Sequence, residues 1–270
     1  MKTILILLLG IFLFSCKSEP KKDKEQETLN ISIFLDLSDR LERQLSPDQM
    51  SRDTTIISYL CDYFKNQTLG PQILNSRNNI RIFFYPTPND PKIATLAQNL
   101  SIDMASLNGI DKRTALENMK ENFLPSLSQI YSLALEQGKK NNYPGCDIWD
   151  FFSHKKVDQL CLRSGARNIL IILTDGYLYH ANNMQQSGNA FSYISQKTLT
   201  LPHSSLIVKR QGLDNLEVLM LEVNPLAPKQ RESIIHVLEN WFKAMGVEKF
   251  LAVETDLPST TQTIIKNFLD

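Results

Sequence analysis

The sequence predicts an α/β fold with a doubly wound, mostly parallel central sheet and helices on both of its faces. Two observations support this prediction. Apolar runs rich in Ile and Leu end at Asp36 and at Asp175, and such runs are typical of strands buried on both faces. Segments with the apolar spacing of amphipathic helices alternate with these and other short β-rich runs. This alternation predicts parallel strands joined by right-handed helical crossovers.

The expected elements follow one another with few interruptions. A helix should begin near Ser46-Pro47-Asp48, and a break or kink is expected at Pro125 inside a long helical pattern. We expect strands up to Asp36, at 79–85, up to Asp175, at 216–223 and at 250–253, and helices at 46–67, 114–137, 228–244 and from 255 to the end of the chain.

One segment, 141–163, does not fit the alternation and is interpreted as an insertion folded on the surface, with an aromatic core of its own. Cys146 and Cys161 bracket much of it. Because a signal peptide would direct the chain to a compartment where disulfides form, we expect these two residues to be paired, with free thiols as the alternative. Cys61 lies in a helical pattern and is expected to be a buried thiol.

The first residues of the chain have the pattern of a signal peptide. A charged start precedes an apolar run, 4–14, which is shorter than the ~20 residues that a membrane-spanning helix needs. The segment 13–16 reads Leu-Phe-Ser-Cys and resembles a bacterial lipobox. This resemblance implies removal of residues 1–15 and acylation of Cys16, whereas an uncleaved anchor or a plain secretory signal are the alternatives.

Residues 16–28 are almost all polar and are expected to form a flexible tether between the lipid and the domain. Lys17 follows the acylated Cys, where an Asp would favour retention in the inner membrane of some bacteria, so we expect an outer-membrane location in the cell envelope. The chain has 29 basic and 29 acidic residues. A neutral chain has no general attraction to nucleic acid, and no nucleic-acid partner is expected.

Acidic and hydroxyl residues follow two of the predicted strands. Asp36 and Ser38 come after the first, and Thr174 and Asp175 end the run 168–175. The carboxyl ends of parallel strands meet at one edge of a sheet, which is where open α/β folds bind ligands. Carboxylate and hydroxyl oxygens are the ligands that a hard divalent cation requires.

The hydrophobic-Asp-x-Ser run, a Thr near a helix start in mid-chain and the later Thr-Asp-Gly together resemble the von Willebrand factor type A domain, over residues 29–270. The resemblance implies a metal-ion-dependent adhesion site with Mg²⁺ or another divalent cation. Asp36 and Ser38 would supply its first loop, Thr114 its second and Asp175 its third. An acidic group of a protein partner would complete the coordination of the metal.

Two tyrosines that follow the third loop, Tyr177 and Tyr179, would then form part of the rim that contacts the partner. Thr114 has a simpler alternative role, which is to cap its helix.

Arg40 departs from the family pattern, because it stands where a second Ser is usual and cannot coordinate a cation. Its side chain could point away and leave Asp36, Ser38, Thr114, Asp175 and also Asp39 around the metal. It could instead fold back and neutralise Asp36 and Asp175 itself. A water-filled site is the third alternative.

These features predict a non-enzymatic, lipid-anchored protein with a binding domain for a protein partner in the envelope or outside the cell. Two other functions remain open. A metal-dependent phosphohydrolase would suit paired Asp residues, but Ser38 stands where an aspartyl-phosphate enzyme has its second Asp, and there is no Gly-rich phosphate loop. A structural lipoprotein with a decayed site would explain Arg40.

Overall fold

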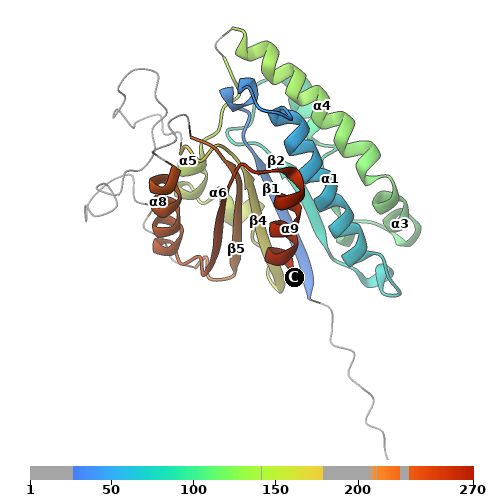
Figure 1. Cartoon of the computed structure of the whole chain (residues 1–270). Helices are drawn as coiled ribbons and strands as arrows, with labels where there is room; N and C mark the ends of the chain where they lie inside the picture. The colour runs from blue at the N-terminus through green and yellow to red at the C-terminus, as the bar shows by residue number, and fades with distance from the viewer. Residues whose placement is uncertain (1–26, 141, 179–207, 209, 211, 226–230) are drawn as a thin grey trace, which may run out of the picture.

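The computed structural model describes residues 27–140, 142–178, 208, 210, 212–225 and 231–270. Its centre is a six-stranded sheet in the order β3-β2-β1-β4-β5-β6 (Figure 1). The strands are β1 (Thr28–Leu35), β2 (Asn79–Phe83), β3 (Ser101–Asp103), β4 (Ala166–Leu173), β5 (Leu216–Val223) and β6 (Lys249–Glu254). Every neighbouring pair is parallel except β2 and β3. The predicted fold class is therefore confirmed, and the antiparallel edge strand β3 is an addition to it.

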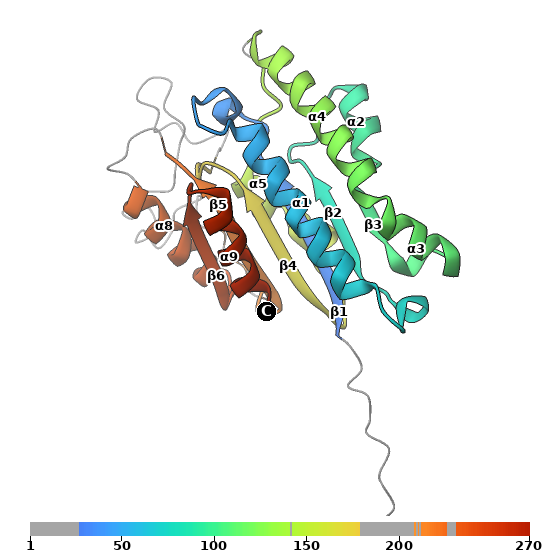
Figure 2. The ribbon, with the colours of Figure 1, turned by 45° about the vertical axis from the view of Figure 1, so that its right-hand side comes forward.

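Helices cover both faces of the sheet (Figures 1 and 2). The α-helices are α1 (Gln49–Thr68), α2 (Pro91–Ala97), α3 (Gly109–Glu117), α4 (Met119–Gly138), α5 (Ile148–Ser153), α6 (Lys156–Leu160), α8 (Arg231–Ala244) and α9 (Pro258–Leu269). Three short 3-10 helices, η1 (Asp39–Glu42), η2 (Ile73–Asn75) and η3 (Met104–Ser106), lie in the connections. Among the described residues, no helix is both long and apolar enough to cross a membrane.

Strand side chains alternate between two hydrophobic cores, as the pleat of a sheet buried on both faces requires. Ile31 and Ile33 of β1 belong to the core under α1, α4 and α9, whereas Phe34 belongs to the core under α5, α6 and α8. Ile171 and Ile172 of β4 divide in the same way. All five side chains are fully buried, so the two central strands hold both layers of helices.

Segment 141–163 is part of this second layer, and its interpretation as a surface insertion is wrong. Phe151 and Phe152 are fully buried against the sheet, where Phe151 packs on Phe34 and Phe152 packs on Trp241 of α8. The segment supplies helices α5 and α6, which lead the chain into β4. It therefore covers the second face of the sheet between α4 and β4.

The predicted disulfide between Cys146 and Cys161 is not formed, and both residues are buried free thiols, as Cys61 is. The carbonyl of Cys161 accepts a hydrogen bond from Asn30 near the start of β1, whereas Cys146 lies close to Asp36, just past the end of that strand. About 20 Å of strand separates these two positions, and a disulfide needs Cα atoms within about 7 Å.

The long helical pattern in mid-chain is divided at Asn118, between α3 and α4, rather than at Pro125, which lies inside α4. Asn118 has ψ near 0°, outside the helical region, and its backbone N–H closes the last turn of α3. The expected break is thus present, but seven residues earlier.

Candidate functional site

The parallel strands define two edges of the sheet. The amino edge is where β1, β2 and β4 begin, and the carboxyl edge is where they end. Asp36 follows β1 at the carboxyl edge, and its backbone N–H donates to the carbonyl of Leu173 at 3.1 Å. One carboxylate oxygen of Asp36 accepts from the backbone N–H of Ser38 at 2.8 Å, and the other accepts from the hydroxyl of Thr174 at 2.9 Å. The carboxylate is buried, with 1% of the residue exposed, and both of its oxygens have partners.

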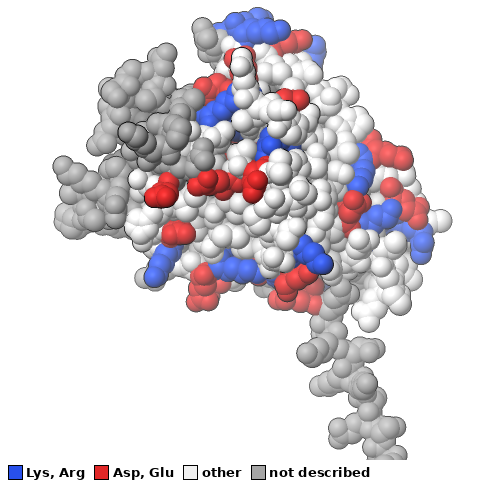
Figure 3. Space-filling view, in the orientation of Figure 1, with Lys and Arg blue, Asp and Glu red and all other residues white. Residues whose placement is uncertain are grey.

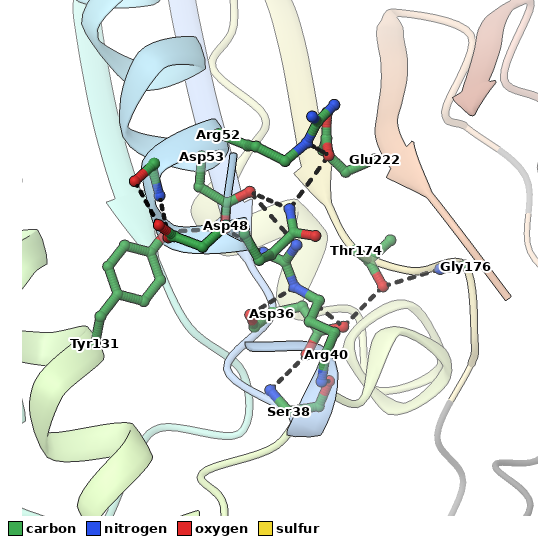
Figure 4. A network of polar contacts seen from close by, with 12 residues as sticks. Asp36, Ser38, Arg40, Asp48, Arg52, Asp53, Tyr131, Thr174, Gly176 and Glu222 are labelled. Carbon is green, nitrogen blue, oxygen red and sulfur yellow. Dashed lines mark hydrogen bonds and ion pairs between the residues drawn. The ribbon is translucent and has the colours of Figure 1, made fainter. Parts of the chain in front are cut away.

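Arg40 folds back beneath this carboxylate, which agrees in part with one of the alternatives above (Figure 4). Its Nε donates to the carbonyl of Asp36 at 3.0 Å and lies 3.9 Å from Asp36 Oδ2. Its two terminal nitrogens point the other way, to the carboxylate of Asp53 on α1 at 2.5 and 3.4 Å. Arg40 is 1% exposed, so this is a buried ion pair. The other part of that alternative, a contact of Arg40 with Asp175, is wrong, because Asp53 takes the guanidinium.

Asp53 is the centre of a buried polar network that the sequence reasoning missed. Besides Arg40, it accepts hydrogen bonds from Gln49 Nε2 at 3.0 Å and from the hydroxyl of Tyr131 on α4 at 2.9 Å. Burial raises the pKa of Asp53, and Arg40 opposes that shift. With all these donors satisfied, the network ties η1, α1 and α4 to one another beneath the carboxyl edge.

The network continues to β5 through an irregular strand residue. Glu222 has φ of +66°, and the pairing register of β5 and β6 shifts between Met220 and Val223. Such a bulge changes the side-chain alternation. Val223 therefore joins the same core as Met220, and Glu222 reaches α1, where it accepts from Arg52 at 2.7 and 3.2 Å.

Arg43 supplies the counter-charge for Asp175. Its Nη2 donates to Asp175 Oδ2 at 2.6 Å, and the other carboxylate oxygen of Asp175 accepts from the backbone N–H of Tyr177 at 3.2 Å. Burial and the neighbouring charge of Asp36 together raise the pKa of Asp175 to about 7, although Arg43 opposes both. The Arg43 Nε is buried and has no hydrogen-bond partner among the described residues. Arg43 thus lies against a carboxylate that the resemblance assigns to a metal ion.

Thr114 is not part of this arrangement, and its expected position beside Asp36 and Asp175 is wrong. It lies exposed on α3, and its hydroxyl donates to the carbonyl of Ile110 at 3.3 Å. The neighbouring Lys112 bonds to the carbonyls of Leu74 and Ser76, just before β2 begins. Helix α3 therefore lies at the amino edge, at the other end of the sheet (Figures 1 and 2).

The remaining predicted residues have different outcomes. Ser38 lies beside Asp36, and its hydroxyl accepts from the backbone N–H of Arg40 at 3.5 Å. Asp39 is half-buried, one of its carboxylate oxygens has no partner in the described part of the chain, and burial raises its pKa. Tyr177 is 6% exposed and packs in the core under α5, α6 and α8 instead of forming a rim. Tyr179 and Cys16 lie outside the described residues.

These contacts do not fit a divalent cation. Both oxygens of Asp36 and both oxygens of Asp175 already accept hydrogen bonds, and Thr114 is distant. Within the described parts of the chain, no group of three His, Cys, Asp or Glu side chains is placed to hold a metal ion. An Mg²⁺ ion needs near-octahedral oxygen ligation, and here a guanidinium occupies part of the space that it would need.

The sequence carried a signal for Asp53 but none for Arg43. Asp53 falls on the apolar face of α1 at helical spacing from Ile56, Ile57 and Leu60, and a carboxylate on a buried face needs a partner. Arg43 is one of several arginines in polar surroundings, and nothing in its spacing distinguishes it.

The fold and the site define an α/β domain with a buried cluster of acids and arginines at its carboxyl edge. No protein-family model and no curated protein matches the chain. It is similar in fold to solved structures that include the pilus adhesin SpaC from Lactobacillus rhamnosus GG (TM-score 0.48, 11% identity, 90% of this chain and 30% of that one). The conserved hypothetical protein BatB from Bacteroides thetaiotaomicron gives a TM-score of 0.41 at 12% identity, over 89% of this chain and 97% of that one.

A third similar structure is proximal thread matrix protein 1 from the mussel byssus, with a TM-score of 0.39 at 11% identity, over 89% of this chain and 45% of that one. The chain spans about a third of the SpaC chain. These similarities are weak and say nothing about function.

Proposed function

We propose that this chain is a lipid-anchored protein of the bacterial envelope, in the outer membrane, with a von Willebrand factor type A-like domain that binds a protein partner and catalyses no reaction. The carboxyl edge of the sheet is the binding site. The observation that carries the proposal is the 2.6 Å contact between Arg43 and Asp175. In this site an arginine, rather than a metal ion, provides the positive charge beside the acidic residues.

An arginine in this position retains the capacity to bind an acidic group. A guanidinium has five N–H donors. Of the three guanidinium nitrogens of Arg43, only Nη2 has a hydrogen-bond acceptor among the described residues. Because Nε is buried, a carboxylate of the partner would meet the unpaired N–H groups of Nη1 and Nη2, much as it would complete the coordination of a metal in the family that the motifs resemble. Planar bidentate pairing with carboxylates is the interaction that arginine makes best.

The position of the site suits a protein displayed from a lipid. β1 begins with Thr28, so the segment from Cys16 joins the domain at the amino edge. Asp36, Arg43 and Asp175 lie at the opposite edge. A partner would thus approach from the side that faces away from the membrane.

The metal question has a direct test in thermal melting of residues 17–270, which retain every described helix and strand, with Mg²⁺ and Mn²⁺ titrated in. We expect no metal-dependent rise for the wild type, because Arg43 holds Asp175. Arg43→Ser removes the guanidinium from Asp175. We expect this variant to gain a metal-dependent stabilisation of ~2.7 kcal/mol when the free metal reaches 100 times its Kd. Asp175→Asn in the same chain should abolish the gain.

Arg113→Ser is the matched control, since Arg113 is an exposed arginine on α3 at the amino edge. It should behave like the wild type. A metal-dependent rise in the wild type that Asp175→Asn abolishes would show that the site holds a metal despite Arg43, and the proposed role of Arg43 would then be wrong.

Binding of a partner is tested separately, by crosslinking in intact cells that carry either the wild type or Arg43→Gln. Each protein is then recovered together with whatever is crosslinked to it. A protein crosslinked to the wild type and absent from an equally folded Arg43→Gln sample supports the proposal. If no crosslinked protein depends on Arg43, the alternative of a structural lipoprotein with a decayed site is favoured.

A further inference from the structure

Two large apolar side chains lie next to each other in solvent at the amino edge. Leu74 in η2 is 63% exposed, and Ile110 in the first turn of α3 is 81% exposed. The two segments touch, because a Cβ on Gly109 would lie 3.2 Å from Leu74 Cδ2. Adjacent protruding apolar side chains of this size are uncommon on a domain that is surrounded by water on every side.

The backbone that carries these side chains is firmly held. Lys112 Nζ donates to the carbonyl of Leu74 at 2.7 Å and to that of Ser76 at 2.9 Å, which ties η2 to α3. Ile73, next to Leu74, is buried in the core under α1. The exposure of Leu74 and Ile110 is therefore built into two anchored turns.

The surface beside them is polar and hollowed. A groove of about 1270 Å³ runs along the amino edge, lined by residues that include Thr28, Leu69, Asn75, Arg77 and Gly165. Arg77 is exposed, and its guanidinium has no hydrogen bond or ion pair with any residue that the structure describes. Elsewhere on the face seen in Figure 3, basic and acidic side chains are interspersed. Apolar tips beside an unpaired cation match the boundary between lipid headgroups and acyl chains.

The same edge receives the chain from Cys16. Thr28 begins β1 and also lines the groove. Residues 17–27 can extend at most about 40 Å, at roughly 3.6 Å per residue. If Cys16 carries lipid, the amino edge is held within that distance of the bilayer, and it is the edge with Leu74 and Ile110.

We propose that the amino edge of the domain rests on the lipid surface, with Leu74 and Ile110 inserted at the level of the headgroups and Arg77 against a lipid phosphate. This proposal rests on the lipid anchor of the proposed function, which holds the amino edge near the bilayer and determines which membrane is bound. The contact orients the domain, so that the cluster of Asp36, Arg43 and Asp175 projects away from the bilayer.

The test is cosedimentation of non-acylated residues 17–270 with phosphatidylcholine vesicles and with vesicles that also contain phosphatidylglycerol. We expect wild type to bind, and the double variant Leu74→Ser with Ile110→Ser to bind at least ~10-fold more weakly, because two apolar side chains no longer enter the interface. Arg77→Gln should weaken binding to both kinds of vesicle, and more strongly to the anionic vesicles, because their net charge also attracts the guanidinium.

Leu257→Ser is a closely matched control. Leu257 is also 63% exposed, but it follows β6 at the carboxyl edge. It should bind as the wild type does, and melting temperatures should show that all variants are folded. Wild type that stays in the supernatant with both kinds of vesicle, or an equal loss in Leu257→Ser, would overturn the proposal. Acylation of Cys16 is measured independently, by mass spectrometry of the protein from its own membranes.

Discussion

Asp53→Ala is expected to lower the free energy of unfolding by about 3–5 kcal/mol, which is the usual cost of removing one partner from a buried ion pair. Arg40 is 1% exposed and would lose the carboxylate that takes both of its terminal nitrogens. Gln49 and Tyr131 would each lose a buried acceptor. The measurement is urea denaturation at pH 7, with the midpoint and slope fitted for both chains.

Two companion variants test the reason for this effect. Asp62→Ala removes an exposed Asp from the same helix and should change stability by less than about 1 kcal/mol. Arg40→Met combined with Asp53→Leu replaces the buried pair with apolar side chains, and we expect it to be much closer to the wild type than Asp53→Ala alone. A loss below about 1 kcal/mol in Asp53→Ala would mean that Arg40 finds water or another partner in solution.

The second large effect is a dependence of stability on pH that comes from Asp175. Its pKa is about 7 in the folded protein, against 3.8 for an ordinary Asp, because burial and Asp36 disfavour its charge. The folded state therefore binds a proton more tightly than the unfolded state does. This stabilisation is complete below pH 4 and is lost as the pH rises through 7.

Relative to Asp175→Asn, the wild type should lose roughly 1 kcal/mol per pH unit, or about 2 kcal/mol between pH 5 and pH 7. Denaturation of both chains at several pH values gives this difference directly. The comparison is needed because burial also raises the pKa of Asp147 to about 7, which adds a dependence of the same sign to both chains. If the difference between the chains does not vary with pH, Asp175 keeps its charge throughout this range.

The fold was predictable because its strongest signals are local. The run 169–173 is apolar at every position, and the run 31–35 is interrupted only by the buried Ser32, a pattern typical of strands covered on both faces. Their pairing in β1 and β4 then places both Asp residues at one edge by geometry alone. The convergence of these two acids therefore follows from the sequence without knowledge of any contact.

The errors concern relations between distant segments. Thr114 was assigned by the order of motifs, but one short antiparallel strand, β3, returns the chain to the amino edge before α3 begins. A strand of three residues leaves little trace in the sequence, so the reversal could not be foreseen. Cys146 and Cys161 bracket one segment of a chain with a signal-peptide pattern, which predicts a disulfide, but α5 and α6 carry the chain between them along the length of the sheet.

The charges around Asp36 were the least predictable feature. The sequence shows that Arg40 is an obstacle to metal binding. Its partner is Asp53, because Asp53 lies on the face of α1 that is turned toward Arg40. Arg43 is then left for Asp175. The resulting arrangement depends on where two flexible side chains point, and residue spacing in a loop does not determine that.

The three buried thiols can report where the domain opens locally. Burial raises the pKa of Cys61 and of Cys161 to about 12, and that of Cys146 above its usual range. A thiol reagent needs the thiolate and access to it, so it reacts only when a molecule opens. Cys61 lies on the buried face of α1, Cys146 beside the carboxyl edge and Cys161 near the amino edge. The rates of modification at these positions would thus map local opening in three separate regions, with no probe added to the chain.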